Sequence, residues 1–447
     1  MQPLADRSPA MIVPCIRSAG HRTQSLPSIL AALDNDPQEN RGRPYRVVAT
    51  HEPSLCLFHL LAGWRAGQIV VFAGSIETAA DMLGTEDALI AEDVIIGDSS
   101  TAPAYTDLVF PSQPDAPAAV VMSSGTTGKP KGILLTRAGI EASADLLIDV
   151  FKLEPGETYG NLSPVHTMGG LRAFMLALRY GNDIQFFEGV EARDLAFAKH
   201  VLSSGVAVVL SGASFVRLLD LSSRWLAGER TALRAIMSCG SLYDDRASRA
   251  VRDAYGIEVV NAYGQTETAG IVMCEPLGVY RPGLMAPPLP GVRQHFRPLD
   301  NEVFELGIEY PHSFFGYVGQ APRSDPIVWT GDLVARHETG IEFKGRDGHA
   351  IKTKTGESWL FPERVEAWIR EHGGVSDAAV RPLPDHSGLW CVVSSPSIPA
   401  TLKSDLCRAL GPEYAELKIY AGIVSRTPSG KLAVMRPSHP DTGTAIS

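Results

Sequence analysis

From residue 45 onward the chain alternates between short apolar strands and amphipathic helices, and this alternation constrains the fold more than any other feature. Residues 47–49 and 69–72 are apolar and mostly β-branched, which favours strands. Between them, residues 53–65 repeat apolar side chains at helical spacing. Strand-helix-strand connections of this kind form parallel sheets that are covered by helices. We therefore predict an α/β fold.

The same alternation continues beyond residue 250. It predicts strands at residues 94–97, 183–187, 206–210, 234–237 and 258–260. It predicts helices at residues 79–83, 138–151, 171–179, 192–203, 213–221 and 244–255. Residues 1–44 are rich in Pro, Ser and Asp with weak periodicity, so they yield no structural prediction.

Length and charge narrow the classes of function. The 447 residues suffice for two or three domains, and 45% hydrophobic with 20% charged residues is ordinary for a globular protein. The net charge is −10 and no Lys/Arg-rich run occurs. A nucleic-acid partner or an anionic membrane surface is therefore not expected, whereas a local cationic site for a nucleotide is compatible with this balance.

The six cysteines are scattered without C-x-x-C spacing, which indicates reduced thiols in a cytoplasmic protein and neither a zinc site nor a disulfide framework. The N-terminus lacks a basic segment followed by an apolar one, so we expect no signal peptide. The apolar runs at residues 55–64 and 69–73 are too short to span a bilayer.

Residues 120–132, VVMSSGTTGKPKG, indicate a phosphate-binding loop that follows a buried strand. Glycines and small residues let several backbone N–H groups converge on an anion, and the hydroxyls and lysines add donors and positive charge. An ordinary surface loop is the alternative for any Gly-rich segment. The spacing differs from G-x-x-x-x-G-K-[ST] because Gly125 and Gly128 lie too close together, which weakens kinase and GTPase interpretations.

The whole string resembles the phosphate loop of the adenylate-forming superfamily, which includes acyl-CoA and aryl-CoA synthetases, peptide-synthetase adenylation domains and luciferases. The resemblance implies that ATP is bound by Ser123, Ser124, Gly125, Thr126, Thr127, Gly128, Lys129 and Lys131.

Residues 261–270, NAYGQTETAG, follow a predicted strand, and loops at the carboxyl ends of parallel strands bind ligands in α/β folds. An aromatic ring can stack on a purine, and a carboxylate can hold Mg²⁺. Taken alone, the segment favours a polar turn with a capping Thr-x-Glu. It resembles the superfamily's Y-G-x-T-E signature, which implies Tyr263 and Gly264 at adenine, Thr266 at the α-phosphate and Glu267 on magnesium.

Residues 238–243, SCGSLY, resemble the superfamily's G-G-A/E-P-L strand end, so Gly240 and Ser241 are expected to line the adenine and acyl pockets. Cys239 departs from the usual glycine. Residues 163–171, SPVHTMGGL, resemble its P-L-F-H-x-x-G segment, with His166 either structural or between the acyl pocket and the thiol tunnel. The expected acyl pocket comprises His166, Met168, Gly169, Gly170, Ser211, Gly212, Cys239 and Gly240.

The segment around residue 172 lacks the Asp that holds the ammonium group in adenylation domains specific for α-amino acids. This favours a carboxylic acid without an α-amino group. Arg172 is compatible with two roles: it pairs with a second carboxylate on the substrate, or it is a solvated helix residue. The stretch before the phosphate loop is short for the superfamily, as in its compact aryl- and succinylbenzoate-type CoA ligases, which favours aromatic or small acids.

The C-terminal motifs follow in the superfamily's order. WTGDL at 329–333 implies that Asp332 binds the ribose hydroxyls, and Arg346 ends the large domain near ribose or phosphate. Gly348 stands at the hinge, where glycine gives the most backbone freedom. Residues 351–357 match the loop that closes over the thiol tunnel, and RTPSGK at 426–431 makes Lys431 the catalytic lysine.

The resemblance implies a large N-terminal domain of parallel-rich sheets over residues 1–346, a hinge at 347–348 and a small mobile α+β domain over 349–447. It implies ATP and Mg²⁺, a small-molecule carboxylic acid, and coenzyme A or a phosphopantetheinyl acyl carrier protein as the thiol partner. The expected reaction is formation of acyl-AMP and then of a thioester. An acyl-AMP ligase that loads a carrier protein and a nucleotide-binding protein without activity are the alternatives, and a homodimer is left open.

Overall fold

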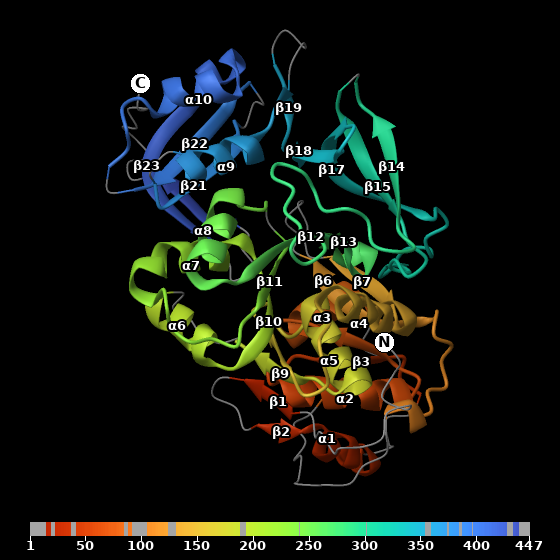
Figure 1. Ribbon diagram of the computed structural model, residues 1–447. Coiled ribbons are helices and arrows are strands. Elements are labelled where there is room, and N and C mark those ends of the chain that lie inside the picture. Colours follow the sequence, from red (N-terminus) through yellow and green to blue (C-terminus); the bar gives the residue numbers. More distant parts are fainter. Residues whose placement is uncertain are drawn as a thin grey trace.

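The structure is a computed structural model of the 447-residue chain. It describes residues 15–18, 23–36, 42–84, 88–91, 105–123, 131–187, 194–240, 242–300, 302–353, 359–372, 375–383, 387–395, 397–426 and 432–437. Figure 1 labels the elements in chain order, from red at the N-terminus to blue at the C-terminus.

The first predicted strands lie in a six-stranded sheet with the order β16-β7-β6-β4-β3-β5. Strands β3, β4, β5 and β6 are parallel, as the alternation predicts. Strand β7 pairs antiparallel with β6, and β16 pairs antiparallel with β7. The strands are β3 (Tyr45–Val48), β4 (Ile69–Phe72), β5 (Ala88–Ile90), β6 (Pro117–Ser123), β7 (Lys131–Thr136) and β16 (Gly316–Tyr317).

Helices cover both faces of this sheet. Helix α2 (Pro53–Arg65) begins where the Glu52 carboxylate accepts hydrogen bonds from the Ser54 and Leu55 amides at 3.1 and 2.6 Å. Helix α3 (Ile76–Leu83) ends at Gly84, whose φ of 61° suits glycine. Val70 packs in the core that contains α2, and its neighbour Val71 packs in the core that contains α3. Successive side chains of β4 therefore point to opposite faces of the sheet, and both faces are buried.

A second, eight-stranded sheet has the order β13-β12-β11-β10-β8-β9-β1-β2. Strands β1 and β8 to β12 are parallel, and β2 and β13 are antiparallel at the edges. The strands are β1 (Cys15–Ser18), β2 (Gln24–Ser25), β8 (Thr158–Asn161), β9 (Asp183–Phe186), β10 (Val206–Ser211), β11 (Ala235–Ser238), β12 (Glu258–Gln265) and β13 (Gly270–Cys274).

Alternate residues of β10 belong to different cores. Val208 and Leu210 share the largest core with α4 and α5 and with strands of the six-stranded sheet, whereas Val209 packs with α6, α7 and α8. The two sheets therefore enclose one common core. The helices are α1 (Leu26–Ala32), α4 (Arg137–Phe151), α5 (Met168–Tyr180), α6 (Leu195–Ser203), α7 (Ala213–Leu226) and α8 (Asp245–Tyr255).

A third sheet, β14-β15-β17-β18, is entirely antiparallel and was not predicted from the α/β alternation. Its strands are β14 (Arg293–Pro298), β15 (Phe304–Glu309), β17 (Ile327–His337) and β18 (Gly340–Arg346). Short 3₁₀ turns are η2 (Leu33–Asn35), η4 (Tyr105–Asp107), η5 (Thr266–Thr268) and η6 (Pro412–Glu416).

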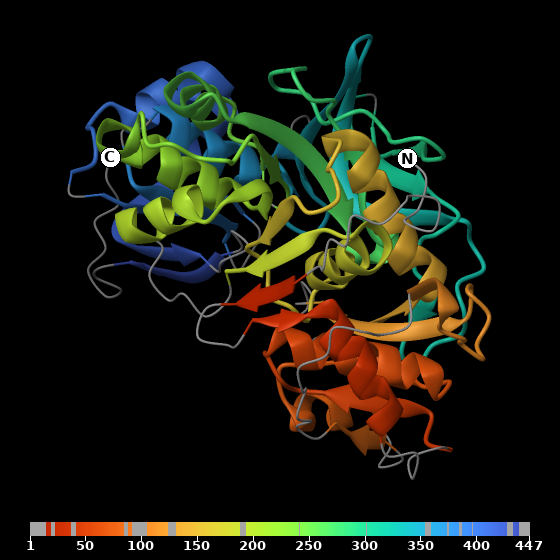
Figure 2. The same cartoon turned by 60° about the horizontal axis from the view of Figure 1, so that its bottom comes forward.

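The C-terminal elements form a small domain with its own hydrophobic core. Its main sheet is β21-β22-β23-β24, preceded by the β19-β20 ladder. The elements are β19 (Ile351–Lys352), β20 (Trp359–Leu360), α9 (Pro362–His372), β21 (Asp377–Pro382), β22 (Leu389–Ser394), α10 (Leu402–Leu410), β23 (Lys418–Arg426) and β24 (Leu432–Pro437). In both views this blue domain lies away from the red N-terminal elements (Figures 1 and 2).

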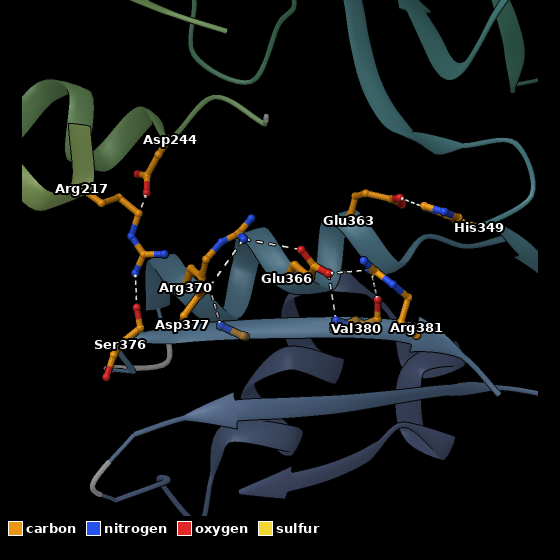
Figure 3. A network of polar contacts seen from close by, with 11 residues as sticks. Arg217, Asp244, His349, Glu363, Glu366, Arg370, Ser376, Asp377, Val380 and Arg381 are labelled. Carbon is orange, nitrogen blue, oxygen red and sulfur yellow. Dashed lines mark hydrogen bonds and ion pairs between the residues drawn. The ribbon is translucent and has the colours of Figure 1, made fainter. Parts of the chain in front are cut away.

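A buried carboxylate ties α9 to β21 inside the small domain (Figure 3). Glu366 is 6% exposed, and its Oε1 accepts hydrogen bonds from the Val380 amide at 2.9 Å and from Arg381 at 3.1 Å. Arg217 of α7 reaches across from the large domain and donates to the Ser376 carbonyl at 3.1 Å. Figure 3 also shows His349 beside Glu363, with Nδ1 and Oε1 2.7 Å apart.

These elements confirm the predicted α/β class, with a large N-terminal and a small C-terminal domain. Most predicted elements exist with small differences at their ends, but α7 runs five residues beyond residue 221, and β12 runs five residues beyond residue 260 to Gln265. Residues 1–44, for which no structure was predicted, contain β1, β2, α1 and η2. The strand predicted at 94–97 lies outside the described residues. Within the described ranges, none of the helices has the length and apolar character needed to cross a membrane.

Candidate active site

The β12–η5–β13 hairpin carries the predicted Tyr263, Gly264, Thr266 and Glu267 beyond the end of the parallel sheet. Gly264 faces the returning strand so closely that an added Cβ would lie 1.9 Å from the Gly270 carbonyl oxygen. The turn closes through Thr268, whose hydroxyl accepts a hydrogen bond from the Gln265 amide at 2.9 Å. The hairpin therefore holds Thr266 and Glu267 on one tight 3₁₀ turn.

Asp332 of β17 gathers three side chains around one buried carboxylate. Tyr263 donates its hydroxyl to Oδ2 at 2.6 Å, and Gln265 donates Nε2 to the same oxygen at 2.9 Å. Arg346 of β18 donates Nε to Oδ1 at 2.7 Å. Asp332 is 2% exposed. The structure thus brings together Tyr263, Asp332 and Arg346, and adds Gln265, which the sequence analysis did not single out.

Tyr263 is held as a neutral hydrogen-bond donor. Burial raises the pKa of its hydroxyl well above the ordinary value, and the neighbouring Asp332 carboxylate raises it further. With its hydroxyl committed to Asp332, the group that Tyr263 retains for a ligand is its aromatic face. That geometry suits stacking on a planar base.

Glu267, Tyr317 and Lys131 form a second cluster at the hairpin. The Tyr317 hydroxyl donates to Glu267 Oε1 at 3.2 Å, and Lys131 Nζ lies 5.5 Å from the centre of the Tyr317 ring. Burial, with the Glu267 charge added, raises the pKa of the Tyr317 hydroxyl to about 12. Tyr317 was not predicted from the sequence, because it lies 50 residues from Glu267 and belongs to no motif.

Glu267 fits a magnesium ion that arrives with a nucleotide. Mg²⁺ is usually held by one or two carboxylates together with substrate phosphates. The described residues contain no group of three or more His, Cys, Asp or Glu placed to hold a metal by themselves. A single carboxylate is therefore compatible with an ion that is shared with substrate phosphates.

Several predicted residues lie outside the described part of the chain. They are Ser124, Gly125, Thr126, Thr127, Gly128 and Lys129 of the phosphate loop, together with Ser241 and Lys431. The residues that flank the phosphate loop are described: Ser123 ends β6, Lys131 begins β7, and the two are paired in the antiparallel ladder. Lys131 is exposed there.

The predicted acyl pocket lies at the carboxyl ends of parallel strands. Ser211 ends β10 and pairs with Ser238 at the end of β11, so Gly212 and Cys239 follow neighbouring strand ends. Gly240 has a φ of 76°, a conformation that favours glycine. Carboxyl ends of parallel strands are where α/β folds bind ligands.

His166 and the glycines of α5 lie beside these strand ends. The His166 ring is half-buried, and its centroid lies 5.1 Å from that of His51, a contact that sequence analysis missed. A Cβ on Gly170 would meet the Val165 carbonyl oxygen at 1.9 Å, and one on Gly169 would meet Leu210 at 2.9 Å. Close packing therefore favours glycine at both positions, although both were predicted only as residues of the acyl pocket. Met168 is buried at the start of α5.

The predicted hinge follows β18 in a turn. Gly348 is exposed, has a φ of 80°, and has open space where a Cβ would be. Of the predicted thiol-tunnel loop at 351–357, residues 351–353 are described, and residues 354–357 lie outside the described part.

Comparison with known proteins shows to which family the chain belongs and which solved structures share its fold. The family model described as "AMP-binding enzyme" matches residues 59–301, more than half of the chain. The chain is similar to the L-proline--[L-prolyl-carrier protein] ligase of Pseudomonas fluorescens, with 25% identity over 66% of this chain and 62% of that protein. It is also similar to the sulfoacetate--CoA ligase of Cupriavidus necator, with 27% identity over 62% of this chain and 56% of that protein.

The fold agrees with that of an O-succinylbenzoate coenzyme A synthetase from Bacillus subtilis. The TM-score is 0.77 with 17% identity, and the alignment covers 94% of both chains. At this identity the likeness establishes the fold alone. The chain spans less than two thirds of the length of the two curated relatives named above.

Proposed function

The chain belongs to the AMP-binding enzyme family, and from this premise we propose that it uses ATP to join a carboxylic acid to a thiol. The family match agrees with the superfamily resemblance of the sequence motifs. The relatives named above are ligases that act on a carrier protein in one case and on CoA in the other.

The proposed reaction has two steps. In the first, an oxygen of the substrate carboxylate attacks the α-phosphorus of ATP, the bond to the β-phosphate oxygen breaks, and pyrophosphate leaves. In the second, the thiol sulfur attacks the acyl carbon of acyl-AMP, AMP leaves, and the thiol proton passes to solvent. Neither step needs a covalent protein intermediate, so orientation and charge stabilisation supply the catalysis.

The observation that carries this proposal is the Asp332 network. One buried carboxylate joins Tyr263 on the hairpin to Arg346 at the end of the large domain. A carboxylate has about four lone-pair positions. Three are used by protein donors at 2.6, 2.7 and 2.9 Å, which leaves room for a ribose hydroxyl. The Tyr263 ring beside it then suits an adenine.

On grounds of charge we assign the phosphates to the side of Lys131 and Glu267. Lys131 supplies positive charge and Thr266 supplies a hydroxyl. Residues 124–130 and Lys431, which lie outside the described part of the chain, are expected to add donors and positive charge. Glu267 would hold Mg²⁺, which neutralises phosphate charge when bound. The Tyr317 hydroxyl donates to Glu267 Oε1 at 3.2 Å, which leaves the other carboxylate oxygen, Oε2, for the ion.

We place the domain boundary at Arg346, with a hinge at 347–348 and a mobile domain over 349–447. Gly348 supports this because its exposed turn and positive φ impose little steric restraint on rotation. A rotation would carry Lys431 away after the first step and bring residues 351–357 over the thiol. Such alternation lets one cavity serve two reactions.

Pyrophosphate release tests the proposal. Wild-type protein is incubated with ATP, Mg²⁺ and a panel of aryl, alkyl and α-amino acids, then with CoA or a phosphopantetheinyl carrier protein as the thiol. We expect release with non-amino acids, at least about 100-fold above proteinogenic α-amino acids, because the pocket segment supplies no carboxylate for an ammonium group.

Lys431→Ala is the matched variant for the first step. We expect it to slow acyl-AMP formation at least about 100-fold while thioester formation from supplied acyl-AMP changes little, because a cation beside the transferring phosphate acts only in the first step. Absence of pyrophosphate release with every acid would instead support a nucleotide-binding protein without ligase activity. Equal loss in both steps would make Lys431 structural.

A further inference from the structure

A guanidinium group without an anionic partner lies beside the predicted acyl pocket. Arg172 stands in the second turn of α5 and is 2% exposed, which rules out the solvated helix residue considered from the sequence. Its Nε and Nη1 atoms are buried and have no hydrogen-bond partner in the described part of the chain. No ion pair joins it to a described carboxylate.

Arg179 of the same helix shows the ordinary arrangement. Its guanidinium forms a two-pronged contact with Asp145, from Nε to Oδ1 and from Nη2 to Oδ2, both at 3.1 Å. Arg179 is thus paired although it is more exposed than Arg172. Because both arginines belong to α5, the difference in their pairing comes from the residues that surround each guanidinium.

The described groups that lie near Arg172 are neutral. A Cβ on Gly270 would lie 2.6 Å from Arg172 Nη2 and 3.3 Å from Met168, so the guanidinium touches the end of the β12–β13 hairpin. Burial raises the pKa of the Cys239 thiol to about 11, with Arg172 lowering it only in part, so this thiol is not an anion at neutral pH. Burial likewise raises the pKa of the Tyr159 hydroxyl, which the Arg172 charge partly opposes.

Tyr159 adds a second buried polar group close to Arg172. Its hydroxyl lies on β8, makes no hydrogen bond of ordinary geometry to a described residue, and is close enough for the Arg172 guanidinium to lower its pKa. A guanidinium and a hydroxyl side by side are donors that match an oxyanion. Both come from segments that flank the strand ends of the predicted acyl pocket.

An arginine keeps its charge in proteins, and a buried charge without a counter-ion is strongly unfavourable. We propose that the acid substrate carries a second anionic group, a carboxylate or sulfonate, that pairs with Arg172 while its reacting carboxylate faces ATP. This inference rests on the proposed acid-activating function and specifies its substrate class. It also places that second group on the Tyr159 and Cys239 side of α5.

Matched pairs of acids test the inference. Butanoate is compared with butanedioate, benzoate with benzene-1,3-dicarboxylate, and acetate with sulfoacetate, and kcat/KM for pyrophosphate release is measured for each. In at least one pair we expect wild-type protein to favour the dianion by about 100-fold, because a site built for a charged group is left unpaired by the analogue that lacks it.

Variants of the two arginines separate recognition from folding. Arg172→Met is expected to lower the dianion-to-monoanion ratio by about 100-fold, and Arg172→Lys to restore part of it. Arg179→Met is the control, since it removes a paired arginine from the same helix and should leave the ratio within about threefold. A wild type that favours the monoanion in every pair would overturn the inference and leave the acid-activating function standing.

A binding measurement tests the inference independently of catalysis. The melting temperature of each variant is measured with the same acids in the absence of ATP, and dianions are expected to raise it for wild type but not for Arg172→Met. If pyrophosphate release fails with all acids, this readout still decides whether Arg172 binds a dianion. A rise in the KM for ATP in Arg172→Met without any change in the acid ratio would assign Arg172 to the nucleotide and overturn the inference.

Discussion

At the scale of single residues, the Asp332 carboxylate organises the candidate site. It accepts from Tyr263 and Gln265 on one oxygen and from Arg346 on the other. Buried carboxylates are stable when such donors surround them, and removing an acceptor leaves the donors unsatisfied. One residue therefore sets the positions of a ring and a guanidinium that come from different strands.

Asp332→Asn tests this organising role. The amide keeps the shape but removes the charge and one acceptor, so we expect the free energy of unfolding to fall by about 1–3 kcal/mol and ATP affinity to fall about tenfold. Denaturant unfolding and calorimetric titration with ATP measure the two effects. Asp405→Asn is the control, because Asp405 forms an exposed pair with Arg408 at 3.0 Å and should change stability by less than about 0.5 kcal/mol. Equal effects of both variants would contradict the assignment.

Which site residues the sequence could predict depends on how local their signal is. Tyr263, Asp332 and Arg346 lie in short motifs, and the structure brings them together. Tyr317 and His51 belong to no motif, and their contacts with Glu267 and His166 depend on how distant segments pack. The sequence could not show that such side chains would meet.

At the scale of elements, the β12–β13 hairpin places residues of the candidate site at one edge of the eight-stranded sheet. The predicted strand at 258–260 covers only part of the parallel section of β12, and the extension to Gln265 pairs antiparallel with the returning strand β13. The helix α2 was predicted with its observed ends, since its apolar spacing is a local signal. The antiparallel sheet β14-β15-β17-β18 carries no such local alternation of helix and strand.

Gly264→Ala tests how tightly this hairpin must close. The added Cβ would lie 1.9 Å from the Gly270 carbonyl oxygen and must push the two strands apart. We expect a loss of about 1–3 kcal/mol in the free energy of unfolding, measured by denaturant titration, and a lower rate of pyrophosphate release. Gly74→Ala is the control because nothing lies within 4 Å of its added Cβ. A Gly264→Ala protein as stable and active as Gly74→Ala would show that the hairpin can widen freely.

At the scale of the whole molecule, the large and small domains each have a hydrophobic core in the part of the chain that the structure describes. The small domain has its own hydrophobic cluster. Half-buried Arg217 donates to the Ser376 carbonyl, Trp359 donates to Asp300, and a small cluster of Val303, Leu333 and Phe361 packs where the domains meet. Interfaces of this kind permit relative motion of domains. The chain between them passes through Gly348.

Gly348→Pro tests whether the domains must rotate. Proline fixes φ near roughly −65°, whereas Gly348 has a φ of 80°, so the variant excludes the arrangement seen in the structure. If the two half-reactions use different domain orientations, they should respond unequally, and we expect the ratio of their rates to change at least about tenfold. Single-turnover formation of acyl-AMP and thioester formation from supplied acyl-AMP measure the two rates. Gly278→Pro is the control, since Gly278 has a φ of 76° and equally open surroundings but lies in the connection between β13 and β14 and not in the proposed hinge. A Gly348→Pro enzyme that keeps both rates, or loses both by the same factor as Gly278→Pro, would show that rotation about this residue is not needed.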